Sequence, residues 1–391
     1  MPPPLLSSPF RPFYFLGTLC AIALTILWLG AFSGRWGGPL DGIPLQVWHG
    51  HEMLFGFAAA IIVGILLTAL PSWAGSEEIR GGRLAVLALL WLAGRVAFWS
   101  APALPALVAP AVDLLLLPVA ALMALPGLLR VNNRLYLLQL PILLALAAAN
   151  GVCWRGMLGG DPALASLGLR AGVYAIILLF VLKGGVLTPI FSGNALRELG
   201  RGDQAAFLPA LEVVAAGLVL LLAALDLGGV PAAWSGAAAL ACALAHGWRL
   251  LRWKGWLLLD APLVLTLHLG FAWLVLAFLL KAAADLTERV PQGAWLHAFT
   301  VGGLGMMMLG LMTRVVLRHT GRPLRVPAAM KLAYVLMFLA AMIRLGAGLS
   351  EPASAAMMTA ATLWGLAFLL YFACFAGFLL RPSLPQPPAG G

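Results

Sequence analysis

The chain has 391 residues, of which 62% are apolar and only 10% are charged. Soluble domains are nearer about 45–50% apolar and about 25% charged, so this composition excludes a water-soluble globule. The formal net charge of +10 does not indicate nucleic-acid binding, because the 24 lysines and arginines are scattered singly and form no basic arm.

The apolar residues lie in long blocks of a length that suits membrane-spanning helices, which need about 20 such residues. Barrel strands would be shorter and would alternate in polarity. We therefore predict an all-α, polytopic transmembrane helix bundle of about 12 spans, forming a single membrane domain over 1–391 with tails at 1–12 and 382–391. The predicted spans are 13–32, 51–71, 83–100, 103–126, 135–153, 168–191, 206–225, 231–251, 258–281, 295–317, 328–347 and 355–380.

The positive charges are distributed unevenly between the two sets of loops. Sixteen fall on the side of the N-terminus and six on the opposite side, while Arg95 and Lys183 fall inside predicted spans. Because lysine and arginine are enriched on the cytoplasmic face, we expect both termini to be cytoplasmic. The loops are too short for an independent domain, so any chemistry is expected within the bundle, surrounded by the lipid bilayer.

Two common signals are absent from the sequence. The four cysteines are far apart and form no C-x-x-C pair, so we interpret them as small buried hydrophobes. No internal duplication is visible in the sequence. Because many transporters are built from internal repeats, this absence disfavours a transporter as the function.

His49 and His51 lie in the segment Trp48-His49-Gly50-His51-Glu52, at the outer end of the second predicted span. Residues two apart on a helix point about 200° apart, so the two imidazoles do not face one metal from a regular helix. Either the helix begins between them or they serve different centres. Glu52 shares a face with His49, where its carboxylate is placed to accept the imidazole N–H. The plainer alternative is a wetted helix N-terminus with an acidic residue.

Several ionisable residues fall within or beside the later blocks. Arg95 and Asp113 lie on consecutive spans, which predicts an ion pair, whereas the sequence identifies no partner for Lys183. We expect His246 to be wetted at the cytoplasmic interface beside Arg249.

His268 is the most deeply buried histidine that the sequence predicts. Asp260 resembles an N-cap and Pro262 an early helical proline, which places His268 about 11 Å inside the cytoplasmic end of its helix. Placing an imidazole inside a membrane costs free energy, and ionisable residues at such positions usually serve a function. His268 is therefore a candidate functional residue.

His297 and His319 lie on the tenth predicted span, 22 residues apart. At 1.5 Å per residue this separation is about 33 Å, so one haem does not bridge the two. The methionines between them offer thioethers to Cu(I), but ordinary helix packing is the commoner reason for such residues.

Several segments resemble the NnrS family. They are Phe10-Arg11-Pro12-Phe13, Trp48 to Met53 with Gly56-Phe57, Leu67 to Gly75, Gly82-Arg83, Gly303 to Met308, Met312 to Val315 and His319-Thr320-Gly321-Arg322. The resemblance implies a bacterial inner-membrane protein that contains haem b and copper and is associated with denitrification and the response to nitric oxide.

Carried over to this sequence, the resemblance implies a pool of metal ligands and two residues that support them. The pool is His49, His51, His268, His297 and His319. Glu52 and Arg83 are candidates for orienting a ligand or pairing with a haem propionate. Which histidines bind haem and which bind copper stays open.

Three functions remain open on these grounds. The first is a haem protein that binds or helps to remove nitric oxide and protects against nitrosative stress, since this small lipid-soluble molecule needs no polar pocket. The second is a quinol-linked nitric-oxide reductase or oxidase, although no His-His dipeptide occurs and the predicted histidines divide between the two membrane faces. The third is a transporter. The sequence does not decide the redox partner or the oligomeric state.

Overall fold

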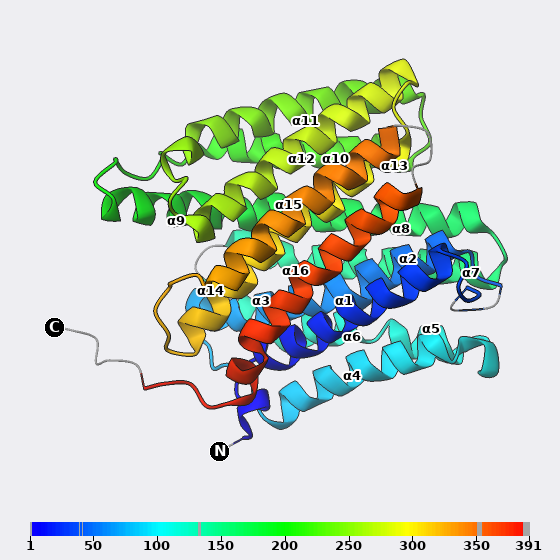
Figure 1. Ribbon diagram of the computed structural model, residues 1–391, viewed down its shortest axis with the longest axis horizontal. Helices are drawn as coiled ribbons and strands as arrows, with labels where there is room; N and C mark the ends of the chain where they lie inside the picture. The colour runs from blue at the N-terminus through cyan, green and yellow to red at the C-terminus, as the bar shows by residue number, and fades with distance from the viewer. Residues whose placement is uncertain (1, 39, 41, 132–133, 350–353, 386–391) are drawn as a thin grey trace. The chain divides into compact units, whose positions relative to one another are not determined.

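The computed structural model describes the chain except for residues 1, 39, 41, 132–133, 350–353 and 386–391. Throughout the described part the regular structure is helical and contains no β-strand (Figure 1). The prediction of an all-α, multi-pass membrane protein is confirmed. Eleven helices among the described residues are long and apolar enough to cross a membrane, one fewer than the predicted twelve.

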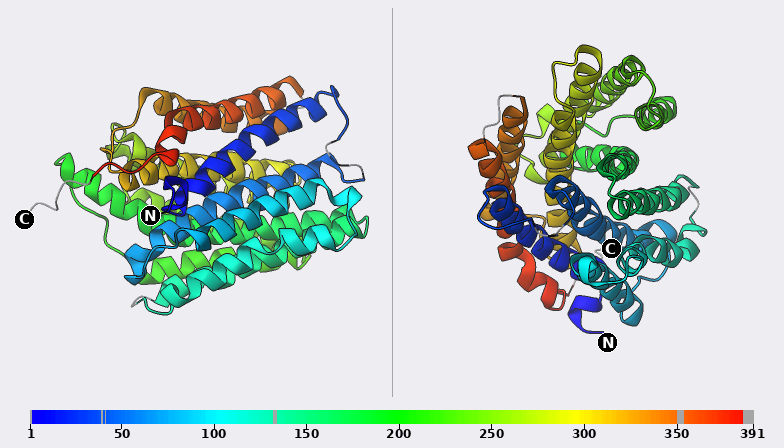
Figure 2. Two further views of the ribbon diagram at one scale, coloured as in Figure 1. Left: turned by 90° about the horizontal axis from the view of Figure 1, so that it is seen from below. Right: turned by 90° about the vertical axis from the view of Figure 1, so that its right-hand side faces the viewer.

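Residue contacts divide the chain into two compact units. Unit 1 comprises 1–175, 314–325 and 368–391, and unit 2 comprises 176–313 and 326–367. Within each unit the helices run roughly parallel or antiparallel to one another (Figures 1 and 2).

The helices up to the middle of the chain include short segments before or within long spans. In order they are η1 (Pro4–Leu6), α1 (Phe10–Phe32), α2 (Leu45–His51), η2 (Glu52–Ala58), α3 (Ala59–Ala74), α4 (Gly82–Trp99), η3 (Ala101–Ala103), α5 (Val108–Asp113), α6 (Leu116–Leu128), η4 (Arg134–Leu138), α7 (Gln139–Leu158) and α8 (Pro162–Leu179). The remaining helices are η5 (Phe180–Gly184), α9 (Gly185–Glu198), α10 (Pro209–Leu227), α11 (Ala232–Arg252), η6 (Gly255–Leu257), α12 (Pro262–Thr287), α13 (Gln292–His297), η7 (Ala298–Leu304), α14 (Gly305–His319), α15 (Ala328–Leu349) and α16 (Ser354–Leu380).

The helix α11 accounts for the difference in span number. It occupies the predicted span 231–251 but is not among the eleven apolar helices. Its composition is less apolar because Ser235, His246, Arg249 and Arg252 lie among its alanines, glycines and leucines. The helix packs along α12 over most of its length (Figure 1).

In the described part of the chain, three π-helical turns interrupt long helices. The segments η2 and η7 each contain seven residues, and each begins directly after a histidine that ends a short helix, His51 and His297 respectively. A glycine lies five residues after each histidine, at Gly56 and Gly302. The two spans are therefore built alike, although the sequence shows no duplication to the eye. π-Helical turns occur frequently at functional sites.

Arg11 joins the beginning of α1 to the end of α16 within unit 1. Its side chain is almost fully buried, and Nη1 donates to the carbonyl oxygens of Phe378, Leu379 and Arg381 at 2.7–3.0 Å. These carbonyls belong to the last turn of a helix, where no intrahelical donor is available. Arg11 therefore caps α16, which gives the Phe-Arg-Pro-Phe motif a structural role.

The His-Thr-Gly-Arg motif at the end of α14 holds the chain that follows α16. The Ser383 hydroxyl donates to the His319 carbonyl at 3.0 Å, and the Leu384 amide donates to the Thr320 carbonyl at 3.0 Å. Gly321 has a positive φ of 74°, and a Cβ there would lie 2.6 Å from the Leu384 carbonyl oxygen, so glycine is required.

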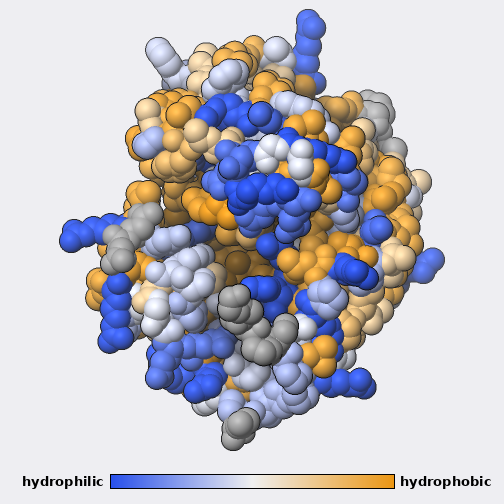
Figure 3. All heavy atoms as spheres, turned by 90° about the vertical axis from the view of Figure 1, so that its left-hand side faces the viewer, coloured by the Kyte–Doolittle hydropathy of each residue, from blue (hydrophilic) through white to orange (hydrophobic). Residues whose placement is uncertain are grey.

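Charged side chains gather at the ends of the helices. Figure 3 shows hydrophilic residues concentrated on one end face, with apolar residues on the flanks. At the end of α9, Arg197 and Arg201 are both exposed. This distribution is expected of helices whose middle sections lie in hydrocarbon.

Candidate functional site

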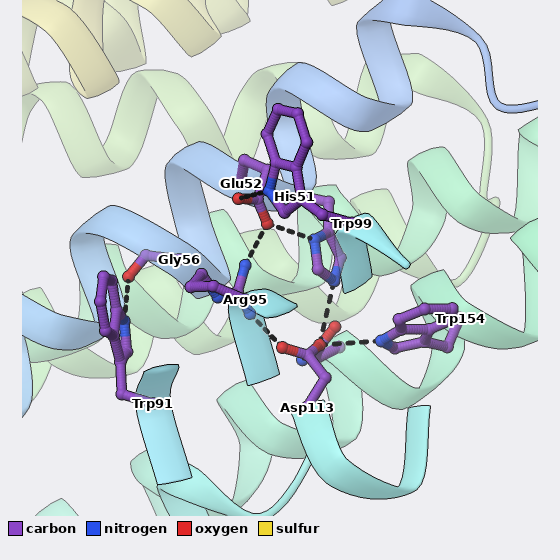
Figure 4. Close-up of polar contacts among 9 residues, drawn as sticks. His51, Glu52, Gly56, Trp91, Arg95, Trp99, Asp113 and Trp154 are labelled. Atoms are coloured by element: carbon purple, nitrogen blue, oxygen red, sulfur yellow. Dashed lines mark hydrogen bonds and ion pairs between the residues drawn. The ribbon is translucent and has the colours of Figure 1, made fainter. Parts of the chain in front are cut away.

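A cluster of buried charges lies in unit 1 where α2 passes into η2 (Figure 4). His51 and Glu52 come from that junction, Arg95 from α4 and Asp113 from α5. The side chains of His51, Glu52 and Asp113 are at most 1% exposed, and that of Arg95 is 11% exposed. We refer to these four residues as the acid–base cluster.

Arg95 bridges the two carboxylates of the acid–base cluster. Its Nη1 donates to Glu52 and its Nη2 donates to Asp113. The predicted pairing of Arg95 with Asp113 is confirmed. Trp99 Nε1 also donates to Glu52 Oε2 at 3.0 Å. Glu52 therefore lies with Arg95, Trp99 and His51, whereas the sequence had suggested His49 as its partner.

Asp113 accepts two further hydrogen bonds from α7. Asn150 Nδ2 and Trp154 Nε1 donate to its Oδ2 at 2.9 and 2.8 Å. A carboxylate in an apolar interior requires several hydrogen-bond donors or cationic partners, because an unpaired buried charge costs several kcal/mol. The sequence missed Asn150 and Trp154, since a single amide or indole within an apolar span carries no distinguishing pattern.

His51 has a carboxylate oxygen on each side of its ring. Nδ1 lies 3.3 Å from Glu52 Oε1, Nε2 lies 3.1 Å from Asp113 Oδ2, and the ring stacks on Phe98. Ionised carboxylates only accept hydrogen bonds, so both ring nitrogens donate and the imidazole carries a positive charge. Two carboxylates, one guanidinium and one imidazolium then balance. In this arrangement His51 offers no lone pair to a metal, and its predicted ligand role stays a prediction.

The π-helical turn η2 is held by an indole. Trp91 Nε1 donates to the Gly56 carbonyl at 2.9 Å (Figure 4). A Cβ at Gly56 would lie 3.0 Å from Arg95 Nη1, so the glycine leaves room for the guanidinium. The turn and the acid–base cluster therefore depend on each other.

His49 and His51 both belong to the regular helix α2, which begins at Leu45. The possibility that the helix begins between them is therefore wrong, and the two rings point in different directions. His49 is half-buried, with its ring 5.8 Å from that of Trp28. Arg83, at the start of α4, is exposed.

His268 lies in unit 2 on α12, which begins at Pro262, one residue later than an N-cap at Asp260 implies. The predicted N-cap is wrong: the capping position is Ala261, and Asp260 accepts a hydrogen bond from Arg201 Nη1 at 2.7 Å instead. His268 is only 5% exposed, and its Nε2 lies 2.8 Å from the Ser192 hydroxyl. Its Nδ1 is buried and has no hydrogen-bond partner among the residues that the structure describes.

His297 ends α13 in unit 2 and is half-buried. Its Nδ1 donates to the Gly293 carbonyl at 2.8 Å, so the lone pair lies on Nε2, which faces Arg344 Nη2 at 3.3 Å. A cavity of about 240 Å³ lies nearby. It is lined by Pro291, Gly293, Ala294, Arg344, Ala347, Gly348 and Met357. This volume is below the roughly 300–1,000 Å³ of usual ligand pockets, so the cavity alone does not accommodate a haem.

His319 is exposed at the end of α14, with its ring 5.7 Å from that of Phe10 in unit 1. The structure therefore distributes the predicted histidines over separate places. Among the described residues, no group of three histidine, cysteine, aspartate or glutamate side chains is placed to hold a metal ion. The methionines Met306, Met307, Met308 and Met312 are all buried, which agrees with a packing role.

His246 is fully buried, so the prediction of a wetted position is wrong. It lies on α11 and accepts a hydrogen bond from Arg249 Nη1 at 3.0 Å. Arg249 also pairs with Glu212 on α10. The helix α10 shields this end of α11, and a single sequence does not reveal that neighbour.

Lys281 forms another buried group that the sequence missed. Lys281 is 2% exposed on α12 and pairs with Asp226 at 2.6 Å and Asp285 at 2.8 Å. Ser235 donates to Asp285 at 2.6 Å. The group connects the ends of α10, α11 and α12.

The helices and buried polar groups define a polytopic α-helical membrane protein with ionisable residues inside its units. The chain belongs to the NnrS family: the family model described as NnrS protein matches residues 4–383, nearly its whole length. No curated protein matches the chain.

Proposed function

We propose that this chain is a haem- and copper-containing protein of the bacterial inner membrane that binds nitric oxide or helps to remove it. Its role would be protection against nitrosative stress during denitrification. The family match over residues 4–383 carries the proposal. Nitric oxide is neutral and lipid-soluble, so a protein built almost entirely of apolar helices is accessible to it from the bilayer.

The donor chemistry of His297 fits an axial ligand of haem b. Its Nδ1–H is held by the Gly293 carbonyl, which fixes the ring and places the lone pair on Nε2, the nitrogen that Arg344 Nη2 approaches to 3.3 Å. Binding of an iron at Nε2 would displace the Arg344 guanidinium, which is suited to pair with a haem propionate because guanidinium binds carboxylates in a bidentate manner. When bound, the haem would supply an iron that binds nitric oxide.

The donor chemistry of His268 fits copper. The Nδ1 atom is buried and without a partner, and imidazole is a suitable ligand for copper. The protein's contribution is to orient the ring through Ser192 and to exclude water from it.

The proposal is tested by a reduced-minus-oxidised spectrum and metal analysis of the purified, detergent-solubilised protein. A haem b spectrum together with stoichiometric copper is expected. Absence of both would refute the proposal.

Rapid mixing of the reduced protein with nitric oxide then separates binding from turnover. A persistent spectral change without gas production indicates binding and supports the proposed protective role. Catalytic release of nitrous oxide would instead identify the chain as the reductase considered above.

A further inference from the structure

Four exposed arginines lie on two connections at one end of unit 1. Arg80 and Arg83 belong to the loop between α3 and α4 and the first turn of α4, and Arg130 and Arg134 belong to the connection between α6 and α7. None of the four forms an ion pair with a carboxylate in the part of the chain that the structure describes. We refer to these four residues as the arginine surface.

The two connections that carry the arginine surface are in direct contact. The ring of Trp73, at the end of α3, stacks on that of Tyr136 in η4, with their centroids 4.8 Å apart. A Cβ at Gly127, at the end of α6, would lie 3.2 Å from the Ser76 hydroxyl of the other connection. The four arginines are therefore neighbours in the fold, although about 50 residues separate the two pairs in the chain.

The acids of these connections leave the arginines without full neutralisation. Glu77 is exposed and forms no ion pair with them. Glu78 is half-buried beside Arg80, and it accepts a hydrogen bond from the Ser8 hydroxyl of the N-terminal segment. Four arginines therefore outnumber two glutamates, and the surface keeps a positive charge.

The positive-inside rule does not account for this absence of acidic partners. The rule counts lysine and arginine alike and is indifferent to ion pairing. In unit 2 the exposed Arg197 and Arg201 pair with Asp203 and Asp260, and all four lysines of the chain lie in that unit. Unit 1 instead presents unpaired arginines, whose planar guanidinium matches the oxygens of a phosphate group.

Exposed leucines lie next to the arginines. Leu129 directly precedes Arg130 and is 66% exposed, and Leu135 directly follows Arg134 and is 62% exposed. A free phosphate or an acidic peptide would leave these side chains in water, whereas acyl chains would remove them from it. The stacked indole and phenol of the same connections are also side chains typical of the headgroup level of a bilayer.

We propose that the arginine surface binds the headgroup of an anionic phospholipid, with the arginines contacting the phosphate and the two leucines contacting the acyl chains. Basic residues immediately outside spanning helices attract anionic lipids. The exposed leucines favour this ligand over an acidic protein, which offers carboxylates without acyl chains. The inference does not depend on the proposed metals or on nitric oxide.

The test titrates the full chain, solubilised in a non-ionic detergent, with fluorescent phosphatidylglycerol in mixed micelles. Fluorescent phosphatidylcholine is the zwitterionic comparison. The wild type should bind phosphatidylglycerol more tightly, and Arg83→Gln/Arg134→Gln should weaken this binding about 25-fold, or about fivefold for each arginine. The matched control is Arg35→Gln/Arg155→Gln, which neutralises two exposed arginines at the other end of unit 1 and should keep the wild-type affinity.

Leu135→Ser separates a lipid from a soluble anion. The substitution should weaken phosphatidylglycerol binding and leave the weak binding of inorganic phosphate and polyglutamate unchanged. Circular dichroism in phosphatidylcholine micelles verifies that every variant folds.

Three results would overturn the inference. The first is equal affinity of the wild type for the two lipids, and the second is wild-type phosphatidylglycerol affinity in Arg83→Gln/Arg134→Gln. The third is binding of inorganic phosphate or polyglutamate as tight as that of phosphatidylglycerol, which would identify a free anion or an acidic protein as the ligand instead.

Discussion

His51 on α2 and Asp113 on α5 face each other with Nε2 and Oδ2 3.1 Å apart, although 62 residues separate them in the chain. Arg95 reaches the same carboxylate from α4. Asp113 is therefore the acceptor on which three other helices converge, since α7 contributes Trp154 as well.

Substitution of Asp113 by leucine should destabilise the protein by about 3–5 kcal/mol, because Arg95 and His51 would remain as insufficiently compensated buried cations. The thermal midpoint in detergent, followed by circular dichroism, measures the loss. Asp203→Leu is the control: Asp203 also pairs with an arginine, but its side chain is 71% exposed. A surface pair contributes little, so this variant should be close to wild type. Equal midpoints for the two variants would contradict the importance of the acid–base cluster.

Arg11→Gln should loosen the end of α16. The substitution removes charged hydrogen bonds to the carbonyls of Phe378, Leu379 and Arg381, each worth about 1.5–3 kcal/mol. Faster hydrogen exchange is expected in the last turn of α16, with unchanged exchange in α7. The exposed Arg35 provides the control as Arg35→Gln. Unchanged exchange in Arg11→Gln would show that the cap is dispensable.

Glu78 should make stability depend on pH. It lies in the loop before α4, where burial raises its pKa above the ordinary value of 4.5 despite a hydrogen bond from the Ser8 hydroxyl. An acid with a raised folded-state pKa binds its proton more tightly when folded, so its contribution is full at low pH and is lost as the pH rises through that pKa. The thermal midpoint should therefore fall over the pH range above 4.5, and Glu78→Gln should reduce this fall. The matched control, Glu77→Gln, changes an exposed neighbour and should keep the wild-type pH profile.

Gly302→Ala and Gly217→Ala should change stability in opposite directions. In η7, a Cβ at Gly302 would lie 2.3 Å from the rigid Trp273 ring, so overpacking should cost about 1–3 kcal/mol. In α10, a Cβ at Gly217 meets nothing, and the higher helix propensity of alanine should add about 0.5–1 kcal/mol. Thermal midpoints compare the two directly. A stable Gly302→Ala variant would mean that η7 and Trp273 separate readily.

The sequence was sufficient for the features that depend on local composition. Long apolar blocks predict membrane helices, because every backbone polar group in hydrocarbon must be bonded within its own helix. The pairing of Arg95 with Asp113 was also predictable, since a buried charge needs a partner and these two lie on consecutive spans. Twelve spans were expected, and eleven helices among the described residues are long and apolar enough to cross a membrane, because α11 has a less apolar composition than the others.

Only the tertiary structure decided how each histidine is used. The sequence treated His51 and His268 alike, yet one has a carboxylate on each side of its ring and the other has a buried nitrogen without a partner. It also placed His246 at a wetted position, although the side chain is buried. The availability of a ring nitrogen depends on hydrogen-bond partners from distant helices, such as Ser192 for His268. Composition and spacing along one helix do not contain that information.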